Sequence, residues 1–123
     1  MEFDVEYFEK EDGTYPAEQF ILSQDVKFRA KIFRGIDLLR IWGKELRMPY
    51  SSHLKEGIFE LRVMHGSNIG RIFYFFESGR KIILTHGLIK KTQRTPLSEI
   101  ARAIQSRCEY LSRKERKNEQ ELP

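Results

Sequence analysis

The sequence predicts a small α+β domain, in which a strand and two helices precede three consecutive strands and a final helix. Two observations predict this class. Residues 54–92 read as three strands of alternating side chains, joined by Gly-containing polar turns at 65–68 and 77–80. Before and after this segment, apolar residues recur at helical spacing. The expected order is β-α-α-β-β-β-α, with a mostly antiparallel sheet and an N-terminal α-hairpin packed on one face. The helices are expected to lie together on that one face.

Composition narrows the kind of protein. The chain has 123 residues, 40% of them hydrophobic and 33% charged, which fits one folded domain rather than a disordered chain. Its one cysteine, Cys108, excludes an intrachain disulfide and a cysteine-rich zinc site. The acidic N-terminus does not read as a secretory signal, and no apolar run approaches the ~20 residues of a membrane-spanning helix. We therefore expect a cytoplasmic protein, and the three scattered histidines give no sign of a metal or other cofactor.

Charge is distributed unevenly along the chain. Residues 1–25 contain one basic and eight acidic residues, a net of −7, whereas residues 26–123 contain 21 basic and 10 acidic residues, a net of +11. A basic body of this kind is typical of proteins that bind a polyanion, of which nucleic acid is the commonest. The alternative is that these lysines and arginines only solvate helix surfaces.

The first half of the chain predicts a strand and a helical hairpin. Residues 2–8 alternate apolar and acidic side chains, as a half-buried strand does. A short helix begins at Pro16, and a longer one spans about Asp25–Trp42 before Gly43 ends it. Residues 44–52 are expected to form an irregular basic link. The apolar stripe of the longer helix consists of Phe28, Ile32, Ile36 and Leu39.

The second half predicts the sheet and a third helix. The strands are expected at about Gly57–Met64, Ile69–Phe76 and Lys81–Leu88. A third helix opens at Thr95-Pro96, with Thr95 as N-cap, and ends near Leu111. Cys108 lies on its apolar stripe and is expected to be buried. The chain then divides into a single domain, residues 1–112, and a disordered charged tail, residues 113–123.

The middle predicted strand carries an unusual arginine. Because side chains alternate along a strand, Arg71 shares a mostly apolar face with Phe73 and Phe75. A charge near a core must be paired or must serve a ligand. Arg71 either pairs with Glu60 on the neighbouring strand or contacts a bound molecule. Tyr74, on the opposite face, either fills the core or stacks on a base.

Three segments, in this order and spacing, resemble a known superfamily: LKEGIFELRV, NIGRIFYFF and ILTHGLIKKTQRTP. They resemble the RelE/ParE superfamily of toxins from type II toxin–antitoxin systems, and most of all its HigB-like, phage-derived branch. The resemblance extends from the first strand to the helix that ends near Leu111. It implies a RelE-like fold and an endoribonuclease, or mRNA interferase, that cleaves mRNA in the A site of the translating 70S ribosome and stops growth. It also implies that the partners are mRNA, ribosomal RNA and a cognate helix-turn-helix antitoxin.

RNA cleavage without a metal needs a base for the 2′-hydroxyl, cations beside the phosphate and an acid for the leaving 5′-oxygen. The resemblance implies that Arg71, which opens the R-x-x-Y strand, contacts the scissile phosphate. Arg62 matches a second recurrent position, and it either lies beside Arg71 or is a plain surface residue. Lys55 is a candidate for phosphate binding or proton transfer, or else a solvated lysine.

The segment after the last predicted strand supplies further cations. Lys91 is a candidate catalytic residue, while Lys90, Thr92 and Arg94 are candidate RNA contacts. The alternative is that these side chains are only solvated.

Two histidines complete the candidates. His86 is either an acid–base group or a satisfied core histidine. His53 precedes the Leu-Lys motif and is a further candidate RNA contact. The general base stays unassigned, because the C-terminal helix offers Tyr110 and no histidine.

Two other functions stay open. A ParE-like toxin shares the fold and poisons DNA gyrase without cutting RNA. The chain could also be a non-catalytic module that binds nucleic acid or an antitoxin. The cations at Arg62, Arg71 and Lys90–Lys91 favour the ribonuclease.

Overall fold

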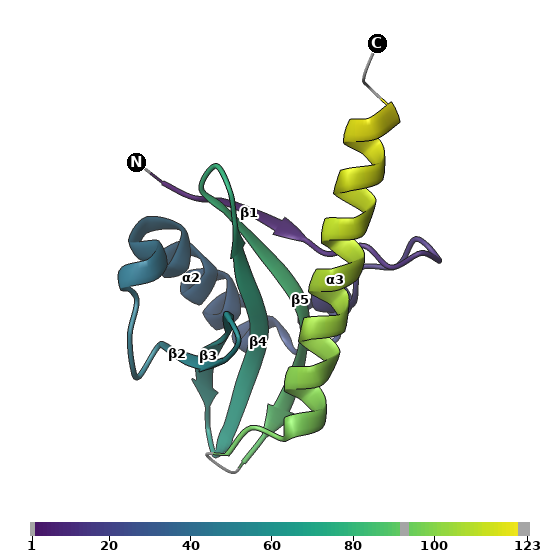
Figure 1. Ribbon diagram of the computed structural model, residues 1–123. Coiled ribbons are helices and arrows are strands. Elements are labelled where there is room, and N and C mark those ends of the chain that lie inside the picture. Colours follow the sequence, from purple (N-terminus) through teal and green to yellow (C-terminus); the bar gives the residue numbers. More distant parts are fainter. Residues whose placement is uncertain (1, 92–93, 121–123) are drawn as a thin grey trace.

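Strand β4 (Asn68–Glu77) is the centre of the molecule, because its side chains are buried on both faces. The computed structural model describes residues 2–91 and 94–120, and in it a five-stranded sheet lies between helices on its two sides (Figure 1). The other strands are β1 (Asp4–Tyr7), β2 (Ser51–Lys55), β3 (Ile58–His65) and β5 (Lys81–Lys90). The helices are α1 (Pro16–Leu22), α2 (Val26–Trp42) and α3 (Leu97–Gln120), with a 3-10 turn, η1 (Gly43–Glu45), after α2.

The sheet order is β1-β5-β4-β3-β2. Strand β1 runs parallel to β5, and the other neighbours are antiparallel. The helical hairpin between β1 and β2 makes the crossover that brings β1 to the far edge beside β5. The predicted α+β class with a mostly antiparallel sheet is confirmed.

The hairpin α1–α2 covers one face of the sheet, as predicted. The apolar stripe of α2 is buried against β3, β4 and β5 in a core that includes Leu61, Ile72 and Leu84. The Asp25 side chain caps α2 by accepting from the Phe28 N–H at 2.8 Å. Gly43 ends the helix at φ 54°, a conformation that suits glycine.

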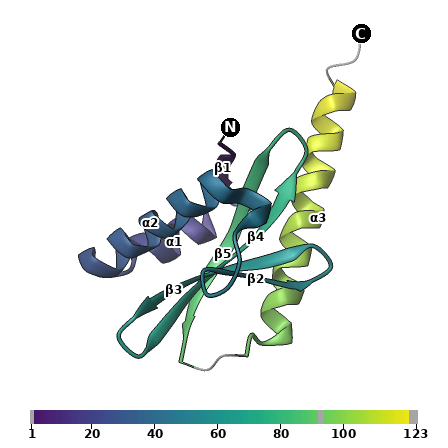
Figure 2. The same ribbon diagram turned by 90° about the vertical axis from the view of Figure 1, so that its left-hand side faces the viewer.

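Helix α3 lies on the opposite face (Figure 2). Its Ile100 and Ala103 pack against Phe73, Phe75 and Ile83 in a second core. Our expectation that the helices gather on one face is therefore wrong for α3. The physical reason is that β4 is apolar on both faces, and each face needs a cover.

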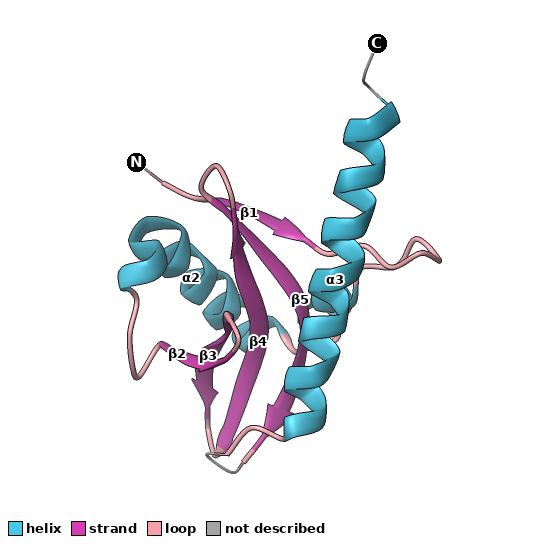
Figure 3. Cartoon of the chain, viewed as in Figure 1, coloured by secondary structure: helices cyan, strands magenta, loops and turns pink. Residues whose placement is uncertain are grey.

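Strand β2 is absent from the predicted order. Its first two residues fall in the segment expected to be an irregular link, and it pairs with β3 from Ser51 opposite Leu61 to Lys55 opposite Ile58. The observed order is therefore β-α-α-β-β-β-β-α (Figure 3).

Helix α3 also departs from its predicted bounds. Leu97 is its first residue, and the helix continues to Gln120, so residues 113–120 are helical where a disordered tail was expected. Cys108 is exposed, so the prediction that it is buried is wrong. Among the described residues, no helix has the length and apolar character needed to cross a bilayer.

Candidate functional site

A charged cluster is buried between the sheet and the start of α3. Arg62 of β3 and Arg71 of β4 are direct neighbours in the strand ladder, and Glu60 lies two residues before Arg62 on the same face. Glu60 Oε1 accepts from Arg62 Nη1 at 3.0 Å and from Arg71 Nη1 at 3.1 Å. One carboxylate therefore serves two guanidinium groups, and the three side chains together keep one excess positive charge.

Thr95 joins this cluster from the segment that leads into α3. Its hydroxyl accepts from Arg71 Nη1 at 2.8 Å and donates to Glu60 Oε2 at 2.5 Å. Pro96 rather than Thr95 provides the first helical carbonyl, which accepts from the N–H groups of Glu99 and Ile100. The Thr95 side chain therefore fastens α3 to the sheet instead of capping the helix.

His86 of β5 makes a second link between the sheet and α3. Its ring stacks on Phe73 at 4.7 Å, and its Nε2 lies 3.1 Å from Oε1 of Glu99. Burial lowers the pKa of His86 to about 4, with the Arg102 charge acting in the same direction and Glu99 opposing both. The imidazole is therefore neutral near pH 7, so that Nε2–H can donate to Glu99, and Nδ1 lies 3.1 Å from the Thr85 hydroxyl, which also lies 3.3 Å from the Phe73 carbonyl.

The structure thus brings together three of the five predicted catalytic residues, Arg62, Arg71 and His86, on adjacent strands under α3. Of the two alternatives for Arg62, the structure shows the first, because Arg62 lies directly beside Arg71 in the strand ladder. Arg71 makes the pairing with Glu60 that was its structural alternative, and its side chain is 0% exposed. Contact between Arg71 and a phosphate stays a prediction, and so does acid–base chemistry at His86.

Exposed cations lie at the end of β5. Lys90 is paired with Ile69, two positions beyond the pairing of Arg71 with Leu88, so Lys90 belongs to the same sheet face as Arg71. Lys90, Lys91 and Arg94 are all exposed, whereas Thr92 lies outside the described residues. This basic end, defined as Lys90, Lys91 and Arg94, is the solvent-facing neighbour of the buried cluster.

Two predicted residues lie apart from these groups. Lys55 is exposed at the end of β2, at the outer edge of the sheet. His53 is exposed with its ring 4.8 Å from Phe59, whose ring stacks on Tyr74 in the core under α2. His53 therefore belongs to the sheet face opposite Arg71, and its contact with RNA stays a prediction.

Tyr74 fills the core, the first of the two alternatives that the sequence leaves open for it. It is 1% exposed on the α2 side, and its hydroxyl lies 2.5 Å from the Ser51 Oγ. Burial raises the pKa of Tyr74 to about 12, so the phenol stays protonated at any physiological pH. Tyr110 packs edge-on against Phe75, with ring centroids 5.7 Å apart.

Sequence reasoning missed what Thr95, Glu99 and Arg102 do here. Alternation along the strand already places Glu60 on the same face as Arg62, but Glu60 was considered as an ion-pair partner for Arg71 alone. No pattern in the sequence indicates that Thr95 and Glu99 reach back to β3, β4 and β5. In the described residues, no group of three or more His, Cys, Asp or Glu side chains is arranged to hold a metal ion.

A comparison with known protein families identifies the family of the chain. Residues 19–107 match the family described as phage-derived protein Gp49-like (DUF891). The match covers all of α2 and β2–β5, and so includes Glu60, Arg62, Arg71 and His86. No curated protein matches the chain. The Gp49-like family is a RelE-like, toxin-like family. The chain belongs to the Gp49-like family of phage-derived proteins.

Proposed function

We propose that the chain is a HigB-like toxin of a type II toxin–antitoxin system, and that it acts as an mRNA endoribonuclease. The observation that carries the proposal is the basic end, which lies beside the Arg62–Glu60–Arg71 cluster in a chain of a toxin-like family. Most of the charged side chains at this end of the sheet are cations. Cleavage of a phosphodiester builds negative charge on the phosphate, and nearby cations stabilise that charge.

The basic end would bind the RNA backbone, because exposed lysines and arginines attract phosphates regardless of sequence. Lys91 and Arg62 are the catalytic cations in this proposal. The Arg62 side chain is 8% exposed, so its guanidinium sits at the boundary between the buried cluster and solvent. In this step the 2′-oxygen would give its proton to a base and bond to the phosphorus, while the bond to the 5′-oxygen breaks and that oxygen takes up a proton. Lys91 and Arg62 would stabilise the negative charge that builds on the phosphate.

His86 and Arg71 have a supporting role in this proposal. Both are buried, and both contact the start of α3 through Glu99 and Thr95. They hold the segment that carries the basic end in place, and they act as positioning residues. The partners that follow from the proposal are mRNA on the 70S ribosome and a cognate helix-turn-helix antitoxin, in the cytoplasm.

A ParE-like gyrase poison is the second candidate. One observation favours it: Arg71 and His86 are buried and bonded to other side chains, so two of the five candidate catalytic residues do not face solvent. A module that only binds nucleic acid or an antitoxin would share this feature.

The test is cleavage of an end-labelled mRNA by the purified chain, with and without programmed 70S ribosomes, read by primer extension. We expect new 5′ ends with the wild type, loss of at least about 90% of them with Lys91→Ala, and no loss with Lys117→Ala. Lys117 is an exposed lysine at the far end of α3. An intact transcript under both conditions, or equal cleavage by both variants, would overturn the proposal.

A further inference from the structure

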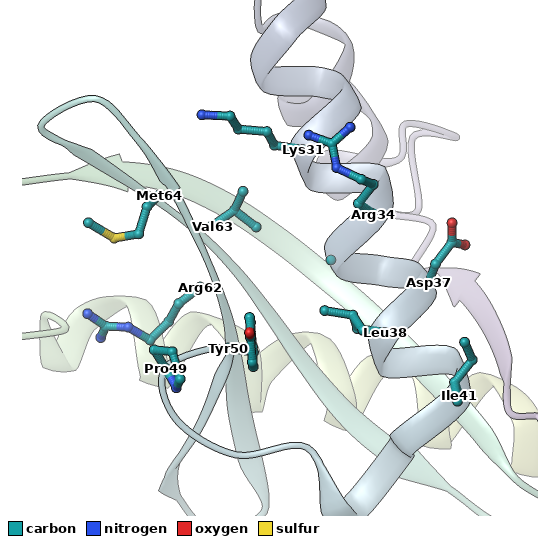
Figure 4. A pocket seen from close by; sticks show the side chains of 11 residues that line it. Lys31, Arg34, Asp37, Leu38, Ile41, Pro49, Tyr50, Arg62, Val63 and Met64 are labelled. Carbon is teal, nitrogen blue, oxygen red and sulfur yellow. The ribbon is translucent and has the colours of Figure 1, made fainter.

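A groove of about 520 Å³ lies between α2 and the outer edge of β3 (Figure 4). Its apolar lining includes Leu38 and Ile41 from α2, Tyr50 from the segment before β2, and Val63 and Met64 from β3. Helix and strand come close here because residue 35 is glycine, where an added Cβ would lie 3.3 Å from Val63 Cγ2. The groove is therefore a product of how α2 packs on the sheet.

The β3 edge that borders the groove is open. Strand β2 pairs with β3 only as far as Ser51 opposite Leu61. Beyond that point the Arg62 N–H donates outward to the Tyr50 carbonyl at 2.8 Å. Backbone groups alternate in direction along a strand, so the N–H and C=O of Met64 point outward as well. An open edge of this kind is a template for another strand.

The groove also exposes large apolar side chains. Ile41, Tyr50 and Met64 are 55%, 50% and 53% exposed, respectively. A neighbouring hollow shares Leu38 and Tyr50 with the groove and adds Trp42 and Met48. Single exposed apolar residues are ordinary, but a continuous patch marks an interaction site.

Charge limits what can lie in the groove. Lys31 and Arg34 stand one turn apart on α2 at its rim (Figure 4), and neither forms an ion pair with another described residue. The third cation of the lining, Arg62, is bonded to Glu60, and the one acidic side chain of the lining, Asp37, is paired with Arg40. The rim therefore favours an acidic ligand, while the apolar lining favours aliphatic or aromatic side chains.

We propose that this groove binds an extended, acidic segment of a partner protein, which adds a strand to β3 at Met64. Alternate side chains of an added strand point to one face, so every second residue would enter the apolar groove while carboxylates reach Lys31 and Arg34. RNA fits less well, because the lining is mostly apolar and one of its three cations, Arg62, is already bonded to Glu60, so the groove offers few polar groups for base edges. The inference goes beyond the proposed ribonuclease and does not rest on it.

Selection of short random peptides displayed on phage tests the inference without a known partner. Peptides enriched on the wild-type chain should combine carboxylates with apolar residues at every second position. Their affinity, measured by fluorescence anisotropy, should fall about ten-fold or more with Lys31→Glu/Arg34→Glu and stay unchanged with Lys117→Glu on the far side.

Two variants of one residue test strand addition itself. Met64→Pro removes the outward N–H, whereas Met64→Ala keeps it, so the first should weaken peptide binding about ten-fold and the second far less. Circular dichroism establishes whether each variant is folded. If Met64→Pro does not fold, the folded Lys31→Glu/Arg34→Glu chain still tests whether the groove binds an acidic peptide.

Three outcomes would overturn the inference. The first is selection that yields no enriched pattern, or peptides that bind every variant equally. The second is a wild-type dimer in light scattering that Lys31→Glu/Arg34→Glu makes monomeric, since the groove would then join two copies. The third is a Lys31→Glu/Arg34→Glu chain that no longer binds a labelled RNA but still binds the peptide.

Discussion

Glu60 is the residue on which the buried cluster depends. It is 1% exposed and bonded to Arg62, Arg71 and Thr95 at once. Two guanidinium groups in an apolar surrounding are costly unless a carboxylate compensates them. The Glu60 carboxylate therefore compensates both arginines, and removal of this carboxylate should affect the whole cluster.

Replacing Glu60 tests this dependence. Glu60→Ala leaves two arginines without their shared carboxylate, and we expect the free energy of unfolding to fall by about 3–5 kcal/mol. The exposed control Glu119→Ala should change it by less than about 0.5 kcal/mol. Urea unfolding followed by circular dichroism measures both, and equal midpoints for the wild type and Glu60→Ala would show that the pairing is dispensable.

His86 predicts how stability depends on pH. Its pKa is lowered to about 4 in the folded chain from an ordinary value of 6.5, so the unfolded chain binds more protons between these values. The stabilisation is complete above pH 6.5 and is lost as the pH falls towards 4, on the order of 3 kcal/mol in total.

The variant His86→Gln separates this effect from the titration of carboxylates. Glutamine can still donate to Glu99 but does not titrate, so the drop in unfolding free energy between pH 7 and pH 4.5 should be smaller than in the wild type. An equal drop in both proteins would place the pH dependence elsewhere.

At this scale, alternation along the strands predicts which side chains share a face. It correctly places Arg71 with Phe73 and Phe75, and Tyr74 in the opposite core. It cannot decide between an ion pair and a ligand contact for Arg71, because that depends on whether Thr95 and α3 cover the site. Thr95 and α3 are distant from Arg71 in the sequence, so alternation along the strand does not show whether they cover it.

Helix α3 is fixed to the sheet by polar contacts at its start and by long-range ones farther along. Thr95 bonds Glu60 and Arg71, while Lys114 Nζ reaches Glu77 at 2.6 Å and Arg113 Nη1 reaches the Glu9 carbonyl at 2.9 Å. These contacts explain how α3 stays helical beyond Leu111, where apolar periodicity ends.

Thr95→Val tests the attachment at the start of α3. Valine keeps the shape but leaves Glu60 Oε2 and Arg71 Nη1 short of a buried hydrogen bond, at a cost of about 1–3 kcal/mol. We expect faster amide exchange in the first turns of α3, measured by mass spectrometry. Thr95→Ser retains the hydroxyl and should restore protection, and if both variants exchange alike the hydroxyl does not fasten the helix.

The junction of α2 and η1 makes a second element-scale prediction. Gly43 and Gly79 both have positive φ, at 54° and 77°, but an added Cβ would overlap the Phe3 ring only at Gly43. Gly79→Ala should cost about 1–2 kcal/mol through backbone strain alone. Gly43→Ala should cost a further 1–3 kcal/mol or so, because Phe3 must move. Thermal unfolding compares the two, and equal losses would mean that Phe3 yields freely.

Two elements show where sequence reasoning stops. The five residues of β2, SSHLK, offer little apolar alternation, and their strand exists because β3 supplies a paired edge. The position of α3 depends on which face of β4 remains uncovered after α1–α2 has packed. Both are tertiary effects that local patterns do not contain.

Over the whole molecule, exposed lysines and arginines mark two surfaces. The basic end lies on the α3 side of the sheet, while the groove with Lys31 and Arg34 borders α2. Arg62 lines the groove and also belongs to the buried cluster, so nucleic acid and a protein partner are proposed for adjoining surfaces of one small chain.

Salt dependence tests the first of these surfaces. Binding of a single-stranded RNA should weaken as salt rises, because phosphate contacts release counterions. Lys90→Ala/Lys91→Ala should reduce the slope of log affinity against log salt by about 1.4, at ~0.7 per contact. Lys10→Ala, within the acidic N-terminal region, is the control and should leave the slope unchanged. A double variant with the wild-type slope would place the RNA elsewhere.

The most direct test of the proposed function is induced expression in growing bacteria, with transcript 5′ ends mapped across several mRNAs. The wild type should be compared with Lys90→Ala/Lys91→Ala rather than Arg71→Ala, because loss of Arg71 would also disturb the buried cluster. We predict that the wild type stops growth and creates new 5′ ends within coding sequences, and that the double variant does neither while accumulating to the same level. Arrested growth without new ends would contradict the ribonuclease and favour a gyrase poison, and unimpaired growth with soluble wild-type protein would contradict both.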